Sequence, residues 1–197
     1  PLSNLDPTLR ERTRREVREV IHRVGITTVL VTHEQDEAFE LGDRVAVLRA
    51  GRLEQVGTPD ELYGAPANRF VGGFVGQSST VPVTVAGPGE RGVRVRIEGV
   101  EWEVELPPGR PMPAPGPAVL LARPEALRIA ESGPDAFSAT VTGRRFVGPS
   151  ALFTVRTAGG ATLEIVAPAR AVRAGQAVAI LPSRRADGGL HLFPVEP

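Results

Sequence analysis

The alternation of hydrophobic and polar positions predicts a layered arrangement of helices and strands in the first part of the chain. Residues 6–24 have the apolar spacing of a helix, which Asp6 and Pro7 can begin and Gly25 can end. Residues 26–32 are β-branched and almost uncharged, which is typical of a strand buried on both faces of a parallel sheet. Further patterns predict short helices from 34 to 41, from 58 onward and from 68 to 75, and a hairpin over 44–56.

The pattern changes after residue 79. Short alternating apolar runs, separated by Gly and Pro, continue to the end of the sequence with almost no helical periodicity. They predict a small antiparallel barrel or a pair of barrels over residues 80–197. The proline-rich stretch 107–117 is expected to be a connection, because proline cannot donate to a strand ladder. Residues 77–79 are then the predicted linker between two domains, 1–76 and 80–197.

Composition and charge exclude several classes of chemistry. The 23 basic residues balance 23 acidic residues, so bulk attraction to nucleic acid or to an anionic membrane is not expected. All basic residues are arginine, which excludes a P-loop lysine and a Schiff-base lysine within these residues. The absence of cysteine excludes a thiol nucleophile and a disulfide framework. We see no signal peptide and no apolar run long enough to span a bilayer, and this predicts a cytoplasmic protein.

A few polar residues are candidates for chemistry. His33 directly follows the predicted strand 26–32, and parallel strands present functional groups at their carboxyl ends. Asp6 can cap a helix, act functionally, or do both. The arginines between residues 10 and 18 are expected to form a solvated helix face. Glu101, Glu103 and Glu105 alternate on one strand face, which is expected to be solvated rather than to hold a metal ion.

Four segments together resemble a known family. They are Pro1–Asp6, Val31–Ala38, Asp43–Leu48 and Gly51–Pro59. In this combination they resemble the C-terminal part of the ATP-binding subunits of ABC transporters, most closely bacterial importers of the maltose, polyamine, ferric-ion and sulfate type. The later segment Leu121–Glu125 and the barrel-like pattern resemble the regulatory region of these subunits, which is an oligonucleotide-fold-like TOBE or molybdate-binding-protein-like domain.

The resemblance implies an α/β fragment of a P-loop NTPase nucleotide-binding domain in 1–76, followed by an all-β domain. It makes the segment from Ser3 to Asp6 the D-loop, which lies across a dimer interface and couples two ATP sites. It makes His33 the switch histidine that contacts the γ-phosphate and the attacking water. The Walker A, Q-loop, signature and Walker B elements are not among these residues, so ATP and Mg²⁺ are expected in the full-length parent, and the chain alone is expected to be inactive.

The resemblance also implies partners, and it leaves a second class of function open. A homodimer, attached through permease subunits to the inner face of the cell membrane, is the implied setting of the transport ATPase. The alternative is a non-catalytic module for regulation, dimerisation or the binding of a small oxyanion. For an oxyanion, Arg123 is the candidate ligand because a guanidinium donates bidentately; the plainer interpretation of Arg123 is an ordinary strand exit. The transported solute is not determined by these residues.

Overall fold

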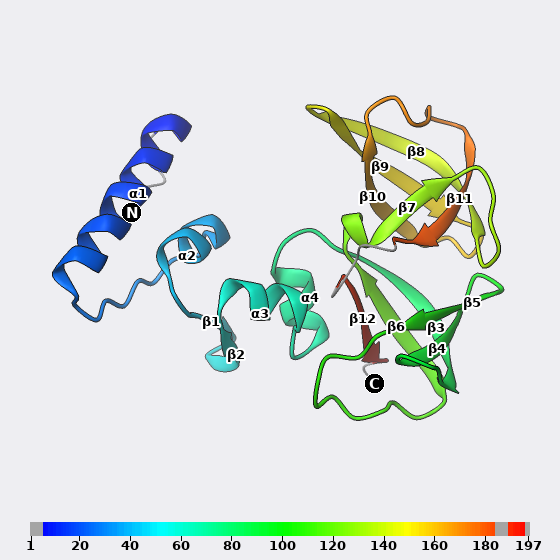
Figure 1. Ribbon diagram of the computed structural model, residues 1–197, viewed down its shortest axis with the longest axis horizontal. Coiled ribbons are helices and arrows are strands. Elements are labelled where there is room, and N and C mark those ends of the chain that lie inside the picture. Colours follow the sequence, from blue (N-terminus) through cyan, green and yellow to red (C-terminus); the bar gives the residue numbers. More distant parts are fainter. Residues whose placement is uncertain (1–5, 184–188, 196–197) are drawn as a thin grey trace. The chain divides into compact units, whose positions relative to one another are not determined.

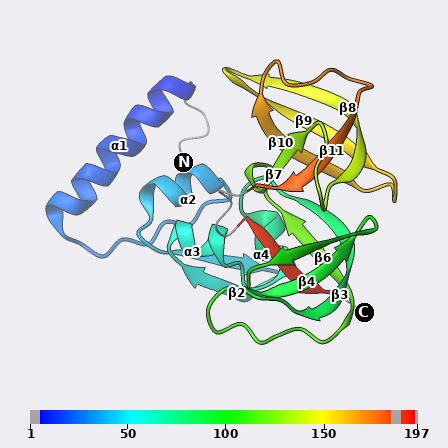
Figure 2. The ribbon, with the colours of Figure 1, turned by 45° about the vertical axis from the view of Figure 1, so that its right-hand side comes forward.

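The computed structural model describes residues 6–183 and 189–195. The chain forms two compact units, Pro1–Tyr63 and Gly64–Pro197, and each is described by itself. Figures 1 and 2 show the helices and the small hairpin of the first unit and the strands of the second. None of the helices in the described part of the chain combines the length and the apolar character that crossing a bilayer requires.

The first unit begins with the long helix α1 (Pro7–Val24). The carboxylate of Asp6 accepts hydrogen bonds from the backbone N–H groups of Thr8 and Leu9 at 3.1 and 3.0 Å, and Gly25 ends the helix at φ 68°. Both predicted ends of this helix are confirmed. The carboxylate accepts from backbone N–H groups that have no partner within the first helical turn. Glycine adopts the left-handed conformation at the end of the helix at little energetic cost because it has no Cβ.

Three further predictions in this unit are confirmed. Helix α2 spans Gln35–Leu41, and the antiparallel hairpin consists of β1 (Val45–Arg49) and β2 (Arg52–Gly57). Helix α3 spans Pro59–Gly64. It starts with a reciprocal capping box, in which the Thr58 N–H donates to Glu61 Oε2 at 2.9 Å and the Glu61 N–H donates to Thr58 Oγ1 at 3.2 Å.

The predicted buried strand over 26–32 is wrong. These residues are extended but form no ladder with any described part of the chain, and the side chains of Val29 and Val31 are each 86% exposed. A strand of a parallel sheet is stabilised by a neighbour on each side and by a helix over each face. Within the described residues no strand pairs with this segment, and the side chains of Val29 and Val31 face outward.

Among its described residues, the second unit has one complete α-helix, which is short, and the remaining strands. Helix α4 spans Arg69–Phe74. Its N-cap is Asn68, whose side chain accepts a hydrogen bond from the Val71 N–H at 2.9 Å. The other elements are β3 (Ser79–Pro88), β4 (Val93–Ile97), β5 (Val100–Val104), β6 (Gly116–Ala122), the 3-10 turn η1 (Pro124–Ala126), β7 (Leu127–Ala130), β8 (Phe137–Val147), β9 (Ser150–Thr157), β10 (Thr162–Pro168), β11 (Ala177–Pro182) and β12 (Leu190–Pro194).

These strands form two five-stranded antiparallel sheets, in the orders β12-β6-β3-β4-β5 and β10-β9-β8-β11-β7. Burial alternates residue by residue along β3 and β4, and the inward side chains of both sheets share one hydrophobic core. Trp102 and Phe137 stack across this core with ring centroids 5.2 Å apart. The antiparallel β domain predicted from the alternating runs is therefore present.

The boundary between the compact units falls before α4, whereas the predicted linker is 77–79. The reason is the packing of α4 against β6. A Cβ added to Gly72 would lie 2.9 Å from Leu121 Cδ1 and 3.6 Å from Phe193 Cε2, so the backbone of α4 lies directly on side chains of the β sheet. Compact packing thus groups α4 with the strands, and the assignment of residues 1–76 to a nucleotide-binding domain stays a prediction.

Candidate functional site

His33 lies in the short turn between the extended residues 26–32 and helix α2, and its side chain is exposed. Hydrogen bonds hold the residues on either side of it. Thr32 Oγ1 accepts from the Glu34 N–H at 3.0 Å and donates to Glu37 Oε2 at 2.7 Å. Glu37 is 1% exposed, so this carboxylate fixes the turn from inside the unit. The candidate histidine is therefore an exposed side chain on a restrained backbone.

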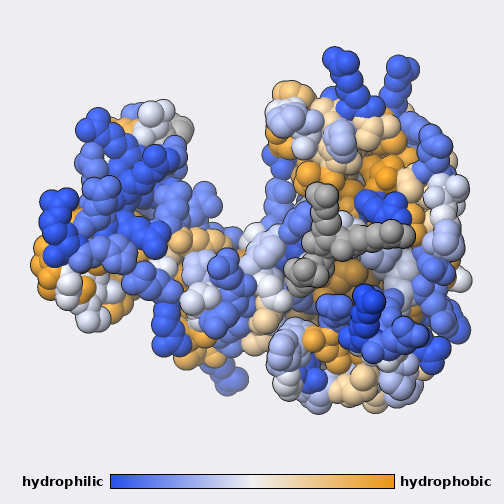
Figure 3. All heavy atoms as spheres, viewed as in Figure 1, coloured by the Kyte–Doolittle hydropathy of each residue, from blue (hydrophilic) through white to orange (hydrophobic). Residues whose placement is uncertain are grey.

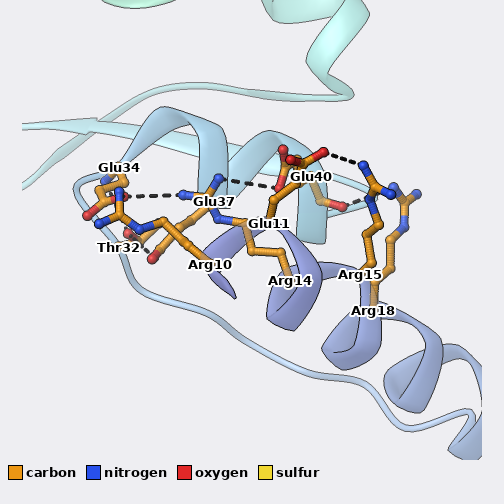
Figure 4. Close-up of polar contacts among 9 residues, drawn as sticks. All are labelled: Arg10, Glu11, Arg14, Arg15, Arg18, Thr32, Glu34, Glu37 and Glu40. Atoms are coloured by element: carbon orange, nitrogen blue, oxygen red, sulfur yellow. Dashed lines mark hydrogen bonds and ion pairs between the residues drawn. The ribbon is translucent and has the colours of Figure 1, made fainter. Parts of the chain in front are cut away.

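Arginines of α1 face the same turn and the helix that follows it. Arg10, Arg14 and Arg18 are four residues apart, so they lie on one face of α1. Arg14 Nη2 lies 3.3 Å from Glu34 Oε2, and Arg14 Nη1 lies 3.4 Å from Glu40 Oε2. Arg10 approaches Glu34 at 4.0 Å, and Arg18 Nη1 donates to the backbone oxygen of Glu40 at 2.9 Å. Figure 4 shows these side chains reaching from α1 toward α2.

The expectation of a solvated arginine face is therefore correct only for part of α1. Arg12 pairs with Glu16 at 2.8 Å, and Arg15 pairs with Glu11, all with exposed side chains. Figure 3 shows hydrophilic side chains over the visible face of this helix. Arg14, by contrast, is 6% exposed. The repeat of arginines at every fourth position, followed by the acidic stretch 34–43, was the available sequence signal for this buried contact.

The other predicted nucleotide-site residues lie at the start of the chain. Ser3 lies outside the described residues. Asp6 is exposed and serves as the N-cap of α1, and within the described chain no hydrogen bond or ion pair joins it to His33. The structure therefore gives Asp6 its capping role, while its part in coupling ATP sites stays a prediction.

Arg123 belongs to the second unit and is fully buried. Its Nη1 donates to the backbone oxygens of Gly72, Val75 and Gln77 at 2.8, 2.6 and 3.3 Å. These carbonyls lie at the end of α4 and just beyond it, where a helix leaves acceptors without internal partners. The side chain thus links the end of α4 to the residue that directly follows β6. The sequence interpretation did not include this role. Its part as an oxyanion ligand stays a prediction.

The acidic strand face contains defined contacts. Glu103 Oε1 accepts from the N–H groups of Arg91 and Gly92 at 2.5 and 3.0 Å. Glu101 pairs with Arg96 at 3.4 Å. Among residues 6–183 and 189–195, no group of three or more His, Cys, Asp or Glu side chains is arranged to hold a metal ion.

Comparison with known proteins shows which proteins this chain is similar to. Residues 120–186 match the model of the TOBE domain. The chain is 41% identical to the Fe(3+) ions import ATP-binding protein of Rhizobium meliloti (strain 1021), over 86% of the chain and 46% of that protein. It is 40% identical to the spermidine/putrescine import ATP-binding protein of Rubrobacter xylanophilus, over 91% and 49%, and 36% identical to the sulfate/thiosulfate import ATP-binding protein of Bradyrhizobium diazoefficiens, over 93% and 51%.

Among solved structures, a cytoplasmic molybdate-binding protein with molybdate bound aligns with 59% of this chain and 95% of its own, with a TM-score of 0.46 and 16% identity. The chain spans about half the length of the curated relatives it matches. The sequence match to import ATP-binding proteins covers most of the chain, and the TOBE match lies within its β unit. By sequence, the chain is therefore similar to about half of the ATP-binding subunit of bacterial ABC importers, and its residues 120–186 match the TOBE domain.

Proposed function

We propose that the chain is part of the ATP-hydrolysing subunit of a bacterial ABC importer, which energises the transport of a solute across the cytoplasmic membrane. The observation that carries this proposal is the likeness to import ATP-binding proteins over most of the chain. In this proposal, residues 1–76 are the C-terminal part of a nucleotide-binding domain. Ser3 and Asp6 belong to its D-loop, His33 is its switch histidine, and the complete subunit binds ATP and Mg²⁺.

The chemistry of His33 suits this role. Phosphoryl transfer depends on positioning and on electrostatic stabilisation more than on covalent chemistry by the protein. A neutral imidazole can donate one hydrogen bond to a phosphate oxygen and accept another from water. The exposed side chain of His33 is accessible for such contacts, and the hydrogen bonds of Thr32 and Glu37 limit the movement of its backbone.

The exposed segment before His33 supports the same proposal. Residues 26–32 have the composition of a strand buried in a parallel sheet, yet they are extended and exposed. We infer that in the complete subunit other parts of the same nucleotide-binding domain cover these exposed apolar side chains, because an exposed apolar segment of this kind marks a contact surface. A homodimer and permease subunits at the inner face of the membrane complete the proposed assembly.

The test is the substitution His33→Ala in the complete subunit. We expect ATP turnover to be nearly abolished while nucleotide affinity changes by no more than several-fold, because the histidine meets charge that develops in the transition state. Unchanged turnover would contradict the assignment, and an equal loss of turnover and affinity would indicate a folding role. The 197-residue chain alone is expected neither to bind ATP tightly nor to hydrolyse it, and activity of the pure chain above background would refute this.

A second candidate function concerns the β unit, which has its own hydrophobic core and matches the TOBE model. It is a non-catalytic role in regulation, dimerisation or the binding of a small oxyanion. Trp102 is the only tryptophan, stacks on Phe137 in the core and donates from Nε1 to the Asp135 carbonyl at 2.7 Å, so its fluorescence reports on both sheets. A saturable response to molybdate, sulfate, phosphate or Fe³⁺ would favour ligand binding. No response to any of them would favour contact with a second subunit or a regulatory protein.

A further inference from the structure

Arg14 joins the two ends of helix α2 to the middle of helix α1. Its Nη2 approaches Glu34 Oε2 at 3.3 Å, where α2 begins, and its Nη1 approaches Glu40 Oε2 at 3.4 Å, where α2 ends. The Arg14 side chain is 7% exposed, whereas those of Glu34 and Glu40 are 25% and 46% exposed. One largely buried guanidinium thus contacts two carboxylates, one through each of its terminal nitrogens.

This contact differs from the other arginine pairs of α1. Arg12 and Glu16 form an ion pair with side chains that are 77% and 60% exposed, and pairs of that kind contribute little because water screens them. A buried charge without a partner is costly. Loss of the contacts with Glu34 and Glu40 is therefore more unfavourable for Arg14 than loss of the Glu16 contact is for Arg12. The planar guanidinium has separate donors for two acceptors, which the single ammonium of a lysine does not provide in the same fixed directions.

The anchored helix begins directly after His33. Helix α2 has seven residues, and its N-cap Glu34 makes no side-chain capping hydrogen bond. A helix this short is marginal by itself and depends on contacts with other elements. Glu34 is held by Arg14 through its carboxylate and by Thr32 through its N–H, and Thr32 is in turn held by Glu37. These contacts restrain the backbone on both sides of His33, because Thr32 and Glu34 are its two neighbours in the sequence.

We propose that Arg14 is a positioning residue for His33. It fixes Glu34, and through Glu34 the turn that presents the imidazole. This inference rests on the proposed function, in which His33 contacts the transferring phosphate. Displacement of a positioned group by about 1 Å can lower a rate by about 100-fold without removing any catalytic side chain.

The first experiment compares Arg14→Gln, Glu34→Gln, the double variant and the control Arg12→Gln in the complete subunit. Arg12 is on the same helix and also pairs with a glutamate, but it is exposed. We expect Arg14→Gln to lower kcat by about 10- to 100-fold and to leave the Kd for ATP within about threefold, with Arg12→Gln unchanged. We expect the kcat of the double variant to be no lower than that of the slower single variant, because the two residues act through one contact and their effects do not add.

Two results would overturn the inference. One is an Arg14→Gln enzyme with the same turnover as Arg12→Gln. The other is an equal loss of turnover and ATP affinity, which would indicate general unfolding. His33→Ala tests the proposed function separately. If His33→Ala abolishes turnover while Arg14→Gln does not, only the positioning role is lost; if His33→Ala retains turnover, the proposed function itself is wrong.

A second measurement covers the case in which Arg14→Gln fails to fold. Arg14→Lys keeps the positive charge but replaces the two terminal guanidinium nitrogens, which contact Glu34 and Glu40, by a single ammonium group. In the 197-residue chain, amide hydrogen exchange is then compared between Arg14→Lys and the unchanged protein. We expect faster exchange at residues 32–36 and unchanged exchange along β3 and β6 of the other unit. Unchanged exchange at residues 32–36 would overturn the inference.

Discussion

Arg123 shows how a single side chain can satisfy several backbone groups at once. Its Nη1 donates to three carbonyl oxygens, those of Gly72, Val75 and Gln77, which are 46 to 51 positions away in the sequence. The guanidinium is fully buried, as are Gly72 and Val75. Burying unsatisfied carbonyls at the end of a helix is unfavourable, so Arg123 stabilises the position of α4 on the β unit.

We expect Arg123→Met to destabilise the β unit by roughly 1–3 kcal/mol, because the apolar side chain fills similar space but no longer donates to the carbonyl of the buried Val75. Urea unfolding of the 197-residue chain, followed through Trp102 fluorescence, measures this. The matched control is Arg128→Met, which removes an exposed arginine and should change stability by no more than about 0.5 kcal/mol. An Arg123→Met protein with normal stability but altered binding of molybdate or sulfate would instead support the ligand role.

Helix α1 is the element whose ends are most clearly encoded in its own residues. The Asp6 carboxylate receives two backbone N–H groups of the first turn, and Gly25 takes the left-handed conformation that ends the helix. The same aspartate is proposed to belong to the D-loop of the complete subunit. Capping requires a side-chain oxygen, whereas coupling between ATP sites can also require the negative charge, so the two roles can be separated.

Asp6→Asn is the variant that separates them, because asparagine caps helices about as well as aspartate. We expect Asp6→Ala to lower the free energy of unfolding by about 1 kcal/mol and Asp6→Asn to leave it nearly unchanged. Thermal unfolding followed by circular dichroism at helix wavelengths measures both. If Asp6→Asn keeps stability and lowers ATP turnover of the complete subunit, the coupling role is supported. If both variants keep normal turnover, Asp6 is a cap alone.

For the whole molecule, the exposed apolar segment 26–32 predicts self-association of the 197-residue chain, most simply as a dimer. Val29 and Val31 are each 86% exposed and lie on extended backbone with no strand beside it in the described chain. Unpaired extended segments of this kind recruit other strands, and a net charge of zero opposes association only weakly.

Light scattering at tens of micromolar measures this association. We expect a mass above that of one chain for the unchanged protein, and a mass of one chain when Val29→Glu and Val31→Glu are combined, because charge on an exposed edge prevents pairing. Val195→Glu changes an exposed valine of the other unit and serves as the control. A monomeric unchanged protein that is rapidly cleaved before Ser79 would contradict the prediction and indicate loose order in residues 1–76.

Local sequence patterns were sufficient for most elements of the fold. The cap at Asp6, the capping box of α3, the β1–β2 hairpin and the alternating strands all depend on residues within a few positions of one another.

Tertiary structure decided the features that depend on distant residues. The strand composition of 26–32 is local, but strand formation requires partners, and no described residue pairs with this segment. The sequence placed Arg14 on a solvated helix face and Arg123 at the end of a strand or in an oxyanion site, whereas their burial follows from partners 20 to 51 positions away. His33 could be singled out from its place after an apolar run, whereas the ion pairs of Arg14 with Glu34 and Glu40 arise only when α1 packs against α2.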